Sequence, residues 1–254
     1  MDSDETLRAR MRHFPRTPGP VQHAFRAVAA CTIRAWLDIY HRFDIVGREN
    51  LPGSGSFVMV ANHASHLDAL CLLSALPLSR LHQAFPAAAA DYFFGSLSRV
   101  ALSVFVINAM PFDRSAHVRE SLDRCRQLLS VPGNILILFP EGTRGTGGRL
   151  GRFRPGIGML LAGSNIPVVP CHLSGTEQAL PKGAWLPRPR RIRLTVGQPQ
   201  VFEPWSQERD SIRQICDCLR QSVLELSGIK QQVDADPTTP DESGLALAAG
   251  CGEH

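Results

Sequence analysis

Residues 57–68 read Phe57-Val58-Met59-Val60-Ala61-Asn62-His63-Ala64-Ser65-His66-Leu67-Asp68. The five apolar side chains predict a buried β-strand, and the polar segment after them predicts a turn leading into a helix. Proteins of the α/β class place their chemistry at such strand ends. His63 and Asp68 are suited to act there as a general base and the carboxylate that orients it.

Five positions separate His63 from Asp68, so on one continuous helix the two side chains would point to different faces. They meet only if His63 precedes the helix and Asp68 lies in its first turn. Residues 65–68 support this arrangement because they form an S-x-x-D capping pattern, with Ser65 as the N-cap. Asp68 could also serve only as a helix cap, and the two roles are compatible because a carboxylate has two oxygens.

A second predicted strand with a polar end follows about seventy residues later, over 135–139. Directly after it, residues 140–144 bring together a carboxylate, a flexible glycine, a hydroxyl and a guanidinium, from Glu141, Gly142, Thr143 and Arg144. An Arg can bind a phosphate or stabilise developing negative charge. The alternative is a solvated loop with an exposed ion pair. Arg114 also follows a predicted strand and would lie at the same edge of the sheet.

Other site chemistries find less support in the sequence. A metal site built from His63, His66 and Asp68 would lack further ligands, because no H-E-x-x-H or Cys/His cluster accompanies it. A serine hydrolase is disfavoured because no G-x-S-x-G elbow is present. We therefore expect no metal.

The order of predicted elements indicates an α/β fold with a central, largely parallel mixed sheet flanked by helices. Strands are predicted over 42–46, 57–61, 103–107, 135–139, 167–171 and 192–196, and helices over 21–41, 68–76, 92–102, 115–129 and 206–227. Three regions follow from this pattern: an N-terminal arm with an amphipathic membrane-association helix (1–41), the α/β domain (42–229) and an acidic tail (230–254). The tail is polar and rich in Pro and acids, which predicts disorder.

Composition bounds the class and the compartment. The chain has 254 residues, enough for one sizeable α/β domain. Seven cysteines lack C-x-x-C spacing, which suggests free thiols in a reducing compartment. The acidic N-terminus lacks the apolar core of a secretory signal, and no uncharged apolar run reaches spanning length, so we expect neither a signal nor a transmembrane segment.

The charge pattern indicates an anionic partner. The formal net charge is +4, and all but two of the 27 basic residues are Arg. Such a balance suits anionic lipid surfaces or phosphorylated substrates; nucleic acid is disfavoured because no binding motif or aromatic platform is present. The helix over 21–41 could lie in a membrane surface or simply cover the sheet. A basic segment could dock lipid or carrier protein, or be a solvated loop; it contains Lys182, Trp185, Arg188, Arg190, Arg191 and Arg193.

Four blocks of this chain resemble those of the glycerolipid acyltransferases typified by 1-acyl-sn-glycerol-3-phosphate acyltransferase. Residues 62–68 match the family's N-H-x-x-x-x-D block, and residues 112–114, 139–144 and 166–170 are similar to the second, third and fourth blocks. Phe153-Arg154-Pro155-Gly156 is also similar to the family's F-K-x-G. The resemblance covers roughly residues 40–200.

The resemblance implies base-catalysed acyl transfer without an acyl-enzyme. His63 would activate an acceptor hydroxyl, with Asp68 holding its tautomer, and the hydroxyl would attack the thioester of acyl-CoA or acyl-carrier protein. Backbone N–H groups near Gly142 and Thr143 would stabilise the oxyanion. The head group of the acceptor would contact Arg114, Glu141, Gly142, Thr143 and Arg144. No cofactor is implied beyond the acyl donor as co-substrate.

The resemblance also places the enzyme at the cytoplasmic face of a membrane, as a peripheral protein of phospholipid biosynthesis, with the acyl chain in an apolar groove near residues 69–107. Many members carry a Lys-containing segment where this chain has Ala87–Asp91, which leaves acceptors other than lysophosphatidate open. Two other functions remain: a lipid-binding protein without catalysis, and a thioesterase.

Overall fold

The computed structural model describes residues 20–89, 110–112, 118–145 and 150–228. Its centre is a seven-stranded sheet in the order β1-β7-β6-β2-β5-β3-β4. All neighbouring pairs are parallel except β6 and β7, which are antiparallel. The predicted α/β class with a largely parallel mixed sheet is confirmed. The strands are β1 (Asp44–Val46), β2 (Phe57–Ala61), β3 (Ala84–Ala89), β4 (Met110–Phe112), β5 (Ile135–Leu138), β6 (Val168–Ser174) and β7 (Arg193–Val196).

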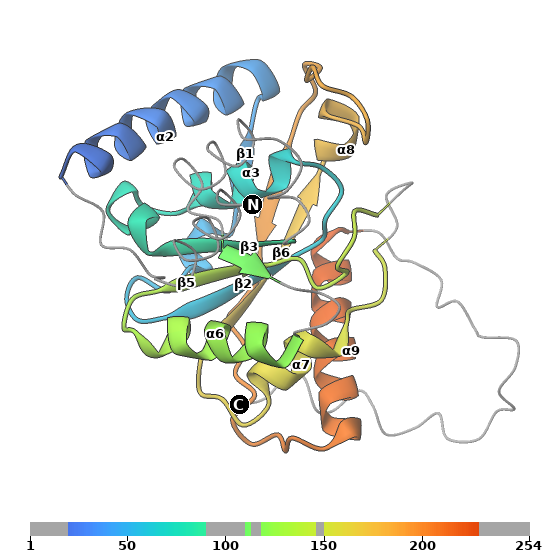
Figure 1. Cartoon of the computed structure of the whole chain (residues 1–254). Helices are drawn as coiled ribbons and strands as arrows, with labels where there is room; N and C mark the ends of the chain where they lie inside the picture. The colour runs from blue at the N-terminus through green and yellow to red at the C-terminus, as the bar shows by residue number, and fades with distance from the viewer. Residues whose placement is uncertain (1–19, 90–109, 113–117, 146–149, 229–254) are drawn as a thin grey trace, which may run out of the picture.

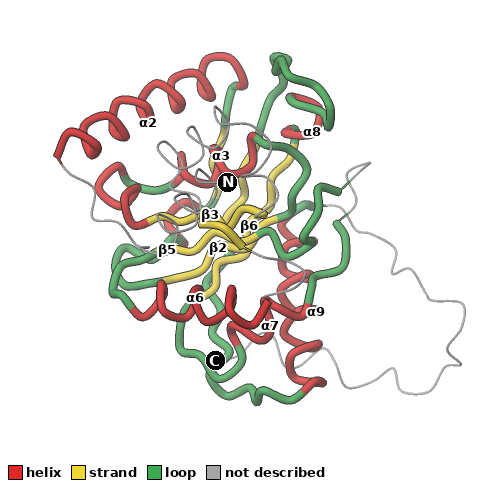
Figure 2. The backbone as a smooth tube through the Cα atoms, viewed as in Figure 1, coloured by secondary structure: helices red, strands yellow, loops and turns green. Residues whose placement is uncertain are grey.

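Helices cover both faces of this sheet (Figures 1 and 2). They are α2 (Pro20–His41), α3 (Leu67–Ala75), α6 (Val118–Ser130), α7 (Pro155–Leu161), α8 (Thr176–Ala179) and α9 (Arg209–Leu226), with short 3-10 turns η1 (Arg48–Asn50) and η2 (Leu78–Gln83). The α2 and α3 helices lie on one face and α6, α7 and α9 on the other.

Strand β2 shows how the sequence produces the two-sided core. All five of its residues are buried, as a central parallel strand covered on both faces requires. Val58 and Val60 pack into the cluster under α6, α7 and α9, whereas Phe57 and Met59 pack into the cluster under α2 and α3. The continuous apolar run therefore fills both cores at once.

The parallel strands bring their carboxyl ends to one edge of the sheet. Strands β6, β2, β5, β3 and β4 all run in the same direction, since each pairs in parallel with its neighbour. The segments that follow β2 and β5 therefore emerge side by side, as the sequence predicted. This edge is where α/β proteins bind ligands.

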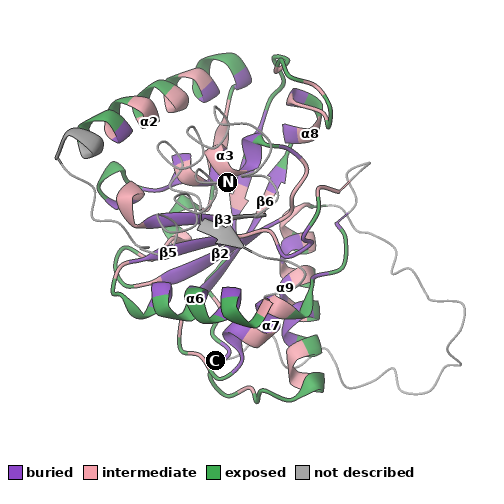
Figure 3. Cartoon of the chain, viewed as in Figure 1, coloured by how far each residue is buried: buried purple, intermediate pink, exposed green. Residues whose placement is uncertain are grey.

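Helix α2 is amphipathic, as predicted, and its two halves have different surroundings. In the C-terminal half, Leu37 is buried and Trp36 half-buried against the sheet, and the Arg34 guanidinium donates to Leu76 O. In the N-terminal half, Phe25 and Val28 are exposed, and Figure 3 shows exposed stretches along the outer side of the helix. The helix therefore covers the sheet and also leaves apolar side chains uncovered, and its place in a membrane surface stays a prediction.

The sequence did not predict β3, β4, α7, α8 or the two 3-10 turns, which all lie outside the predicted strands and helices. Strand β3 contains four alanines and a proline, which are poor strand formers, but it is held between β5 and β4. Helix α7 contains Gly156 and Gly158, which lower helix propensity. At Gly158 a Cβ atom would lie 2.4 Å from Ile212 O of α9, so the close packing of α7 on α9 requires glycine. Helix α8 is a single turn.

Several predicted segments lie outside the described residues: the arm before residue 20, the helix over 92–102, the strand over 103–107 and the tail from 230. None of the helices in the described ranges is both long and apolar enough to cross a bilayer. The six cysteines in those ranges are free thiols, and burial raises the pKa of four of them, Cys71, Cys125, Cys171 and Cys216, that of Cys125 to about 12.

Candidate active site

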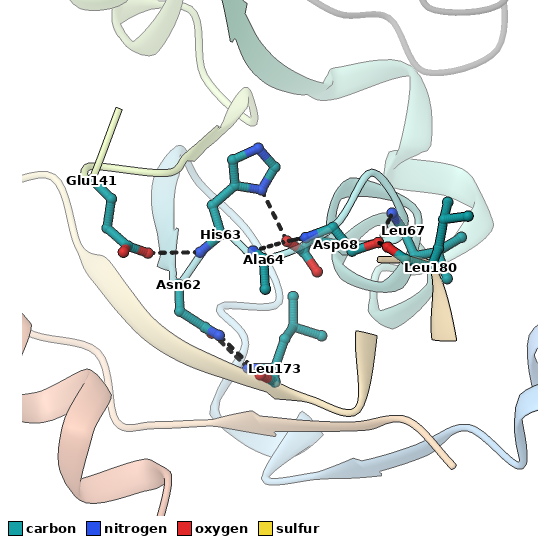
Figure 4. A network of polar contacts seen from close by, with 9 residues as sticks. Asn62, His63, Ala64, Leu67, Asp68, Glu141, Leu173 and Leu180 are labelled. Atoms are coloured by element: carbon teal, nitrogen blue, oxygen red, sulfur yellow. Dashed lines mark hydrogen bonds and ion pairs between the residues drawn. The ribbon is translucent and has the colours of Figure 1, made fainter. Parts of the chain in front are cut away.

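The catalytic candidate His63 lies in the turn between β2 and α3. The residue before it, Asn62, bonds to the neighbouring strand β6 through its side chain. The Asn62 amide donates to Leu173 O at 2.9 Å and accepts from Leu173 N–H at 2.7 Å. These two hydrogen bonds fix the end of β2 against β6. The turn that carries His63 therefore starts from a rigid point (Figure 4).

Asp68 meets His63 as the sequence predicted, because it lies in the first turn of α3 while His63 precedes the helix. Its Oδ2 atom lies 2.9 Å from His63 Nδ1 and also accepts the N–H groups of Ala64 at 2.7 Å and Ser65 at 2.8 Å. Asp68 is fully buried, and 18% of the His63 side chain is exposed. An ionised carboxylate only accepts hydrogen bonds, so the contact places the proton on Nδ1 and leaves the Nε2 lone pair for substrate.

The helix cap differs by one residue from the prediction. The residue before α3 is His66, whose side chain makes no capping bond, rather than Ser65. Ser65 Oγ accepts the Leu67 N–H at 3.3 Å and donates to Leu180 O at 2.9 Å. The other hydrogen bond expected of the S-x-x-D capping pattern is present, because the Asp68 carboxylate accepts the Ser65 N–H. Asp68 uses the same oxygen, Oδ2, for capping and for orienting His63, rather than one oxygen for each role. Its Oδ1 has no hydrogen-bond partner among the described residues.

Glu141 is the second carboxylate of the site and is buried. Its Oε1 accepts the His63 N–H and its Oε2 accepts the Gly151 N–H, each at 2.8 Å. Burial raises the pKa of Glu141, and the two N–H donors partly oppose that rise. Each of its oxygens accepts one main-chain N–H, and the predicted contact with the acceptor stays a prediction. Its position indicates support of the His63 turn.

Two further contacts join the turns that follow β2 and β5. The Phe139 ring stacks on the His63 imidazole, with 4.3 Å between centroids and 23° between planes. Gly145 N–H donates to His63 O at 2.8 Å. The two blocks that the sequence singled out are therefore in direct contact through both main chain and side chains.

The remaining predicted residues of the second turn have the following places. Gly142 has φ of +75°, which favours glycine, and a Cβ atom there would lie 2.4 Å from Nε of the Arg154 side chain, which would have to shift. Its N–H donates to Phe139 O at 3.1 Å. Thr143 is exposed and Arg144 half-buried. Arg114 lies outside the described residues, although β4, which precedes it, ends at the same edge.

A polar pocket of about 200 Å³ opens beside His63. It is lined from the turns after β2 and β5 and from β6 and α8, including Asn62, Glu141, His172, Ser174 and Gln178. His172, whose pKa is lowered by burial, was not predicted from the sequence as a site residue. Cys171 pairs with Ala61 in the parallel strands β6 and β2, so the next residues, His172 and Asn62, lie side by side. The register of these strands cannot be read from the sequence, so His172 could not be predicted from it.

An apolar pocket of about 420 Å³ lies on the other side of Phe139. Its walls come from β3, α6, β5 and α7, with Ala87, Leu122, Cys125, Phe139 and Ile157 among the lining residues. Of the region 69–107, where we expected the acyl groove, only residues 69–89 are described, and Ala87 contributes to this pocket. The stacked pair of His63 and Phe139 thus stands between a polar and an apolar compartment.

Metal binding has no candidate in the described ranges, where no three His, Cys, Asp or Glu side chains lie close enough together to hold an ion. His63 and Asp68 are bonded to each other instead.

Comparison with known proteins assigns this arrangement to a family. The family model described as Acyltransferase matches residues 42–174, just over half of the chain. That range contains the His63 turn, the Glu141 turn and the strands that carry them.

Curated relatives agree with this match. The chain is 34% identical over 148 residues to a chloroplastic 1-acyl-sn-glycerol-3-phosphate acyltransferase of Brassica napus, covering 57% of the chain and 41% of the relative. A 1-acyl-sn-glycerol-3-phosphate acyltransferase of Chlamydomonas reinhardtii is 30% identical over 225 residues, covering 87% and 63%. The chain therefore spans between about two fifths and two thirds of the length of these relatives.

The fold has a counterpart among solved structures. The 1-acyl-sn-glycerophosphate acyltransferase PlsC of Thermotoga maritima superposes with a TM-score of 0.61, covering 90% of each chain at 22% identity. At that identity the likeness concerns the fold.

Proposed function

This chain belongs to the acyltransferase family, and we propose that it moves a fatty acyl group from an acyl thioester to a hydroxyl of a lysophospholipid such as 1-acylglycerol-3-phosphate. The observation that carries the proposal is the 2.9 Å contact of His63 Nδ1 with the buried Asp68 carboxylate. It leaves a partly exposed imidazole nitrogen at the mouth of a polar pocket. A protein that only binds lipid has no use for an oriented base.

The reaction follows from the position of that base. His63 Nε2 removes the proton of the acceptor hydroxyl while the hydroxyl oxygen attacks the thioester carbonyl carbon. Asp68 stabilises the imidazolium that forms. The C–S bond then breaks, the ester remains, and the imidazolium returns its proton to the leaving thiolate. No acyl-enzyme and no cofactor enter this sequence.

The second turn supports the chemistry. The Thr143 N–H makes no backbone hydrogen bond to another described residue and suits the oxyanion of the tetrahedral intermediate. Gly142, whose N–H serves its own turn, shapes the backbone beside it. Arg144, together with Arg114, holds the acceptor phosphate. Glu141 lines the polar pocket and also supports the site through the His63 main chain.

The two compartments suit the two ends of the substrates. The polar pocket beside His63 receives the acceptor head group, and the apolar pocket behind Phe139 receives an acyl chain. Acyl-CoA or acyl-carrier protein supplies the thioester. The exposed apolar side chains of α2, Phe25 and Val28, suit a helix lying in a lipid surface, which supports a peripheral enzyme. We place it at the cytoplasmic face of the membrane as part of the proposal.

His63→Ala tests the proposal. Transfer from an acyl thioester to lysophosphatidate should fall at least about 1,000-fold while the variant stays folded, because the general base is lost. His66→Ala, three residues away and exposed, is the matched control and should retain activity. Products are identified by mass spectrometry with a mixture of lysolipids and hydroxylated lipids. Retained transfer in His63→Ala, or release of thiol and free fatty acid without any acylated lipid, would overturn the proposal.

A further inference from the structure

The loop that joins α8 to β7 exposes two large apolar side chains. Trp185 is 85% exposed and Leu186 61% exposed, in a loop that runs over residues 181–191 and that we call the Trp185 loop. Trp is buried on average in folded proteins. An adjacent Trp–Leu pair in solvent indicates a surface that binds something apolar.

The same loop is basic. Between Lys182 and Arg193 the chain has five Lys and Arg residues and no acidic residue. Arg191 and Arg193 lie 3.7 Å and 2.9 Å from Asp44 Oδ2, so their charge is partly neutralised. In contrast, Lys182, Arg188 and Arg190 are exposed and form no ion pair with another described residue.

The loop is held firmly despite its exposure. Arg188 N–H donates to Ala179 O at 2.7 Å, and the Tyr40 hydroxyl donates to Pro187 O at 3.1 Å. His41 Nδ1 lies 3.2 Å from Arg190 O. The tip that carries Trp185 is therefore presented from a fixed base that includes the C-terminal end of α2.

The Trp185 loop lies between the end of α2 and the elements that carry the candidate site. At the end of α2, Ile39 is 82% exposed and Tyr40, which donates to Pro187 O of the loop, is exposed as well, so apolar side chains are also exposed beside the loop. On the other side, Leu180 O accepts the Ser65 hydroxyl from the His63 turn, and α8 lines the polar pocket. The loop therefore connects an apolar, basic surface to the site.

We propose that the Trp185 loop docks on a bilayer containing anionic phospholipid, with Trp185 and Leu186 inserted at the head-group level and Lys182, Arg188 and Arg190 against lipid phosphates. Trp at the tip and Arg around it is the composition that favours this interface. An acidic carrier protein would satisfy the charges but would leave no reason for a Trp–Leu tip in solvent. The part of this inference in which the docked loop brings the site to its lipid substrate rests on the proposed function.

Vesicle binding tests the docking without any substrate. Co-sedimentation is measured with vesicles of phosphatidylcholine alone and with vesicles that also contain phosphatidylglycerol, whose negative surface potential attracts basic segments. The triple variant K182S/R188S/R190S should bind the anionic vesicles about 100-fold more weakly, because each base near such a surface contributes about a fivefold factor. W185S/L186S should bind both kinds of vesicle more weakly.

A charge-matched control separates docking from net charge. R119S/R209S/R213S removes three exposed arginines from α6 and α9, on the opposite face, and should bind within about threefold of the parent. Equal losses in the two triple variants would overturn the proposal. So would unchanged vesicle binding accompanied by weaker binding of acyl-carrier protein in K182S/R188S/R190S, which would make the loop a carrier-protein site.

Activity on a dispersed short-chain lysolipid distinguishes this proposal from the proposed function. The loop variants should keep that activity and lose it on vesicle-borne lysolipid, whereas His63→Ala should bind vesicles normally and be inactive on both. Loss of dispersed activity in W185S/L186S, with vesicle binding intact, would overturn the docking role.

Discussion

Glu141 holds His63 by its main chain: the carboxylate accepts the His63 N–H at 2.8 Å, while the imidazole of the same residue is held by Asp68. The candidate base is thus fixed at two places by two carboxylates, one on its backbone and one on its ring. Asp68 lies in the helix that follows β2, and Glu141 lies in the turn that follows β5. The geometry of the site therefore depends on the register of β2 and β5.

We expect Glu141→Gln to lower kcat about 10- to 100-fold and to leave KM for the acceptor nearly unchanged. Both Glu141 oxygens accept main-chain N–H groups, so the NH2 group of Gln would face either the His63 N–H or the Gly151 N–H, donor to donor. The free energy of unfolding should fall by about 1–3 kcal/mol. Glu120→Gln, at an exposed position on α6, is the control for charge loss. A raised KM with unchanged kcat would instead mean that Glu141 touches the acceptor.

Replacement of Asp68 by Asn and by Ala should separate orientation from capping. All three donors reach Oδ2 and none of the described donors reaches Oδ1, so Asn can place its oxygen and its amide group without a clash. Asp68→Asn should therefore keep most of its stability and lose about 100- to 1,000-fold in kcat, because the imidazolium loses its counter-charge. Asp68→Ala should also lose about 1–3 kcal/mol in urea unfolding. Equal kcat for Asp68→Asn and the parent would refute the orienting role.

Gly142→Ala should destabilise the protein more than Gly55→Ala does. Both glycines have positive φ, +75° and +74°, so both substitutions carry the same backbone strain of about 1 kcal/mol. Only at Gly142 would the new Cβ meet Arg154, whereas at Gly55 nothing lies within 4 Å. Thermal unfolding should show a further loss of about 1 kcal/mol for Gly142→Ala. That excess should shrink in an Arg154→Ala background, and its persistence there would exclude the contact as the cause.

His172→Gln should weaken the pH dependence of stability. Burial lowers the pKa of His172 below the usual value of about 6.5, so its contribution is present above pH 6.5 and is lost as the pH falls toward the folded-state pKa. Each such His steepens the loss by roughly 1 kcal/mol per pH unit in that window. His41, whose pKa burial also lowers, keeps part of the slope in the variant. Urea unfolding between pH 7.5 and 5 measures it, with exposed His66→Gln as the control; an unchanged slope in His172→Gln would contradict the assignment.

The sequence predicted the elements with strong periodicity and missed those that depend on neighbours. Strand β2 was placed at its observed bounds, because five consecutive apolar residues beside a polar turn are distinctive. Strand β3 was missed because its alanines give no strand signal, and only pairing with β5 and β4 makes it a strand.

The same division applies to the site. The contact of His63 with Asp68 followed from spacing and capping chemistry, both of which are local. The engagement of Glu141 and the place of His172 could not be derived, because they depend on which main-chain groups distant turns bring within 3 Å. Sequence identifies the side chains that can do chemistry, and tertiary contacts decide which of them face substrate.

The ring of Phe139 has a consequence for product fidelity. It stacks on the imidazole, which lines the polar pocket, and itself lines the apolar pocket, so it stands between the base and the apolar pocket. A thioester activated beside water can be hydrolysed instead of transferred. We expect Phe139→Ala to increase the share of free fatty acid among the products, measured against Phe139→Leu, so that a single flat side chain governs how much acyl donor is wasted.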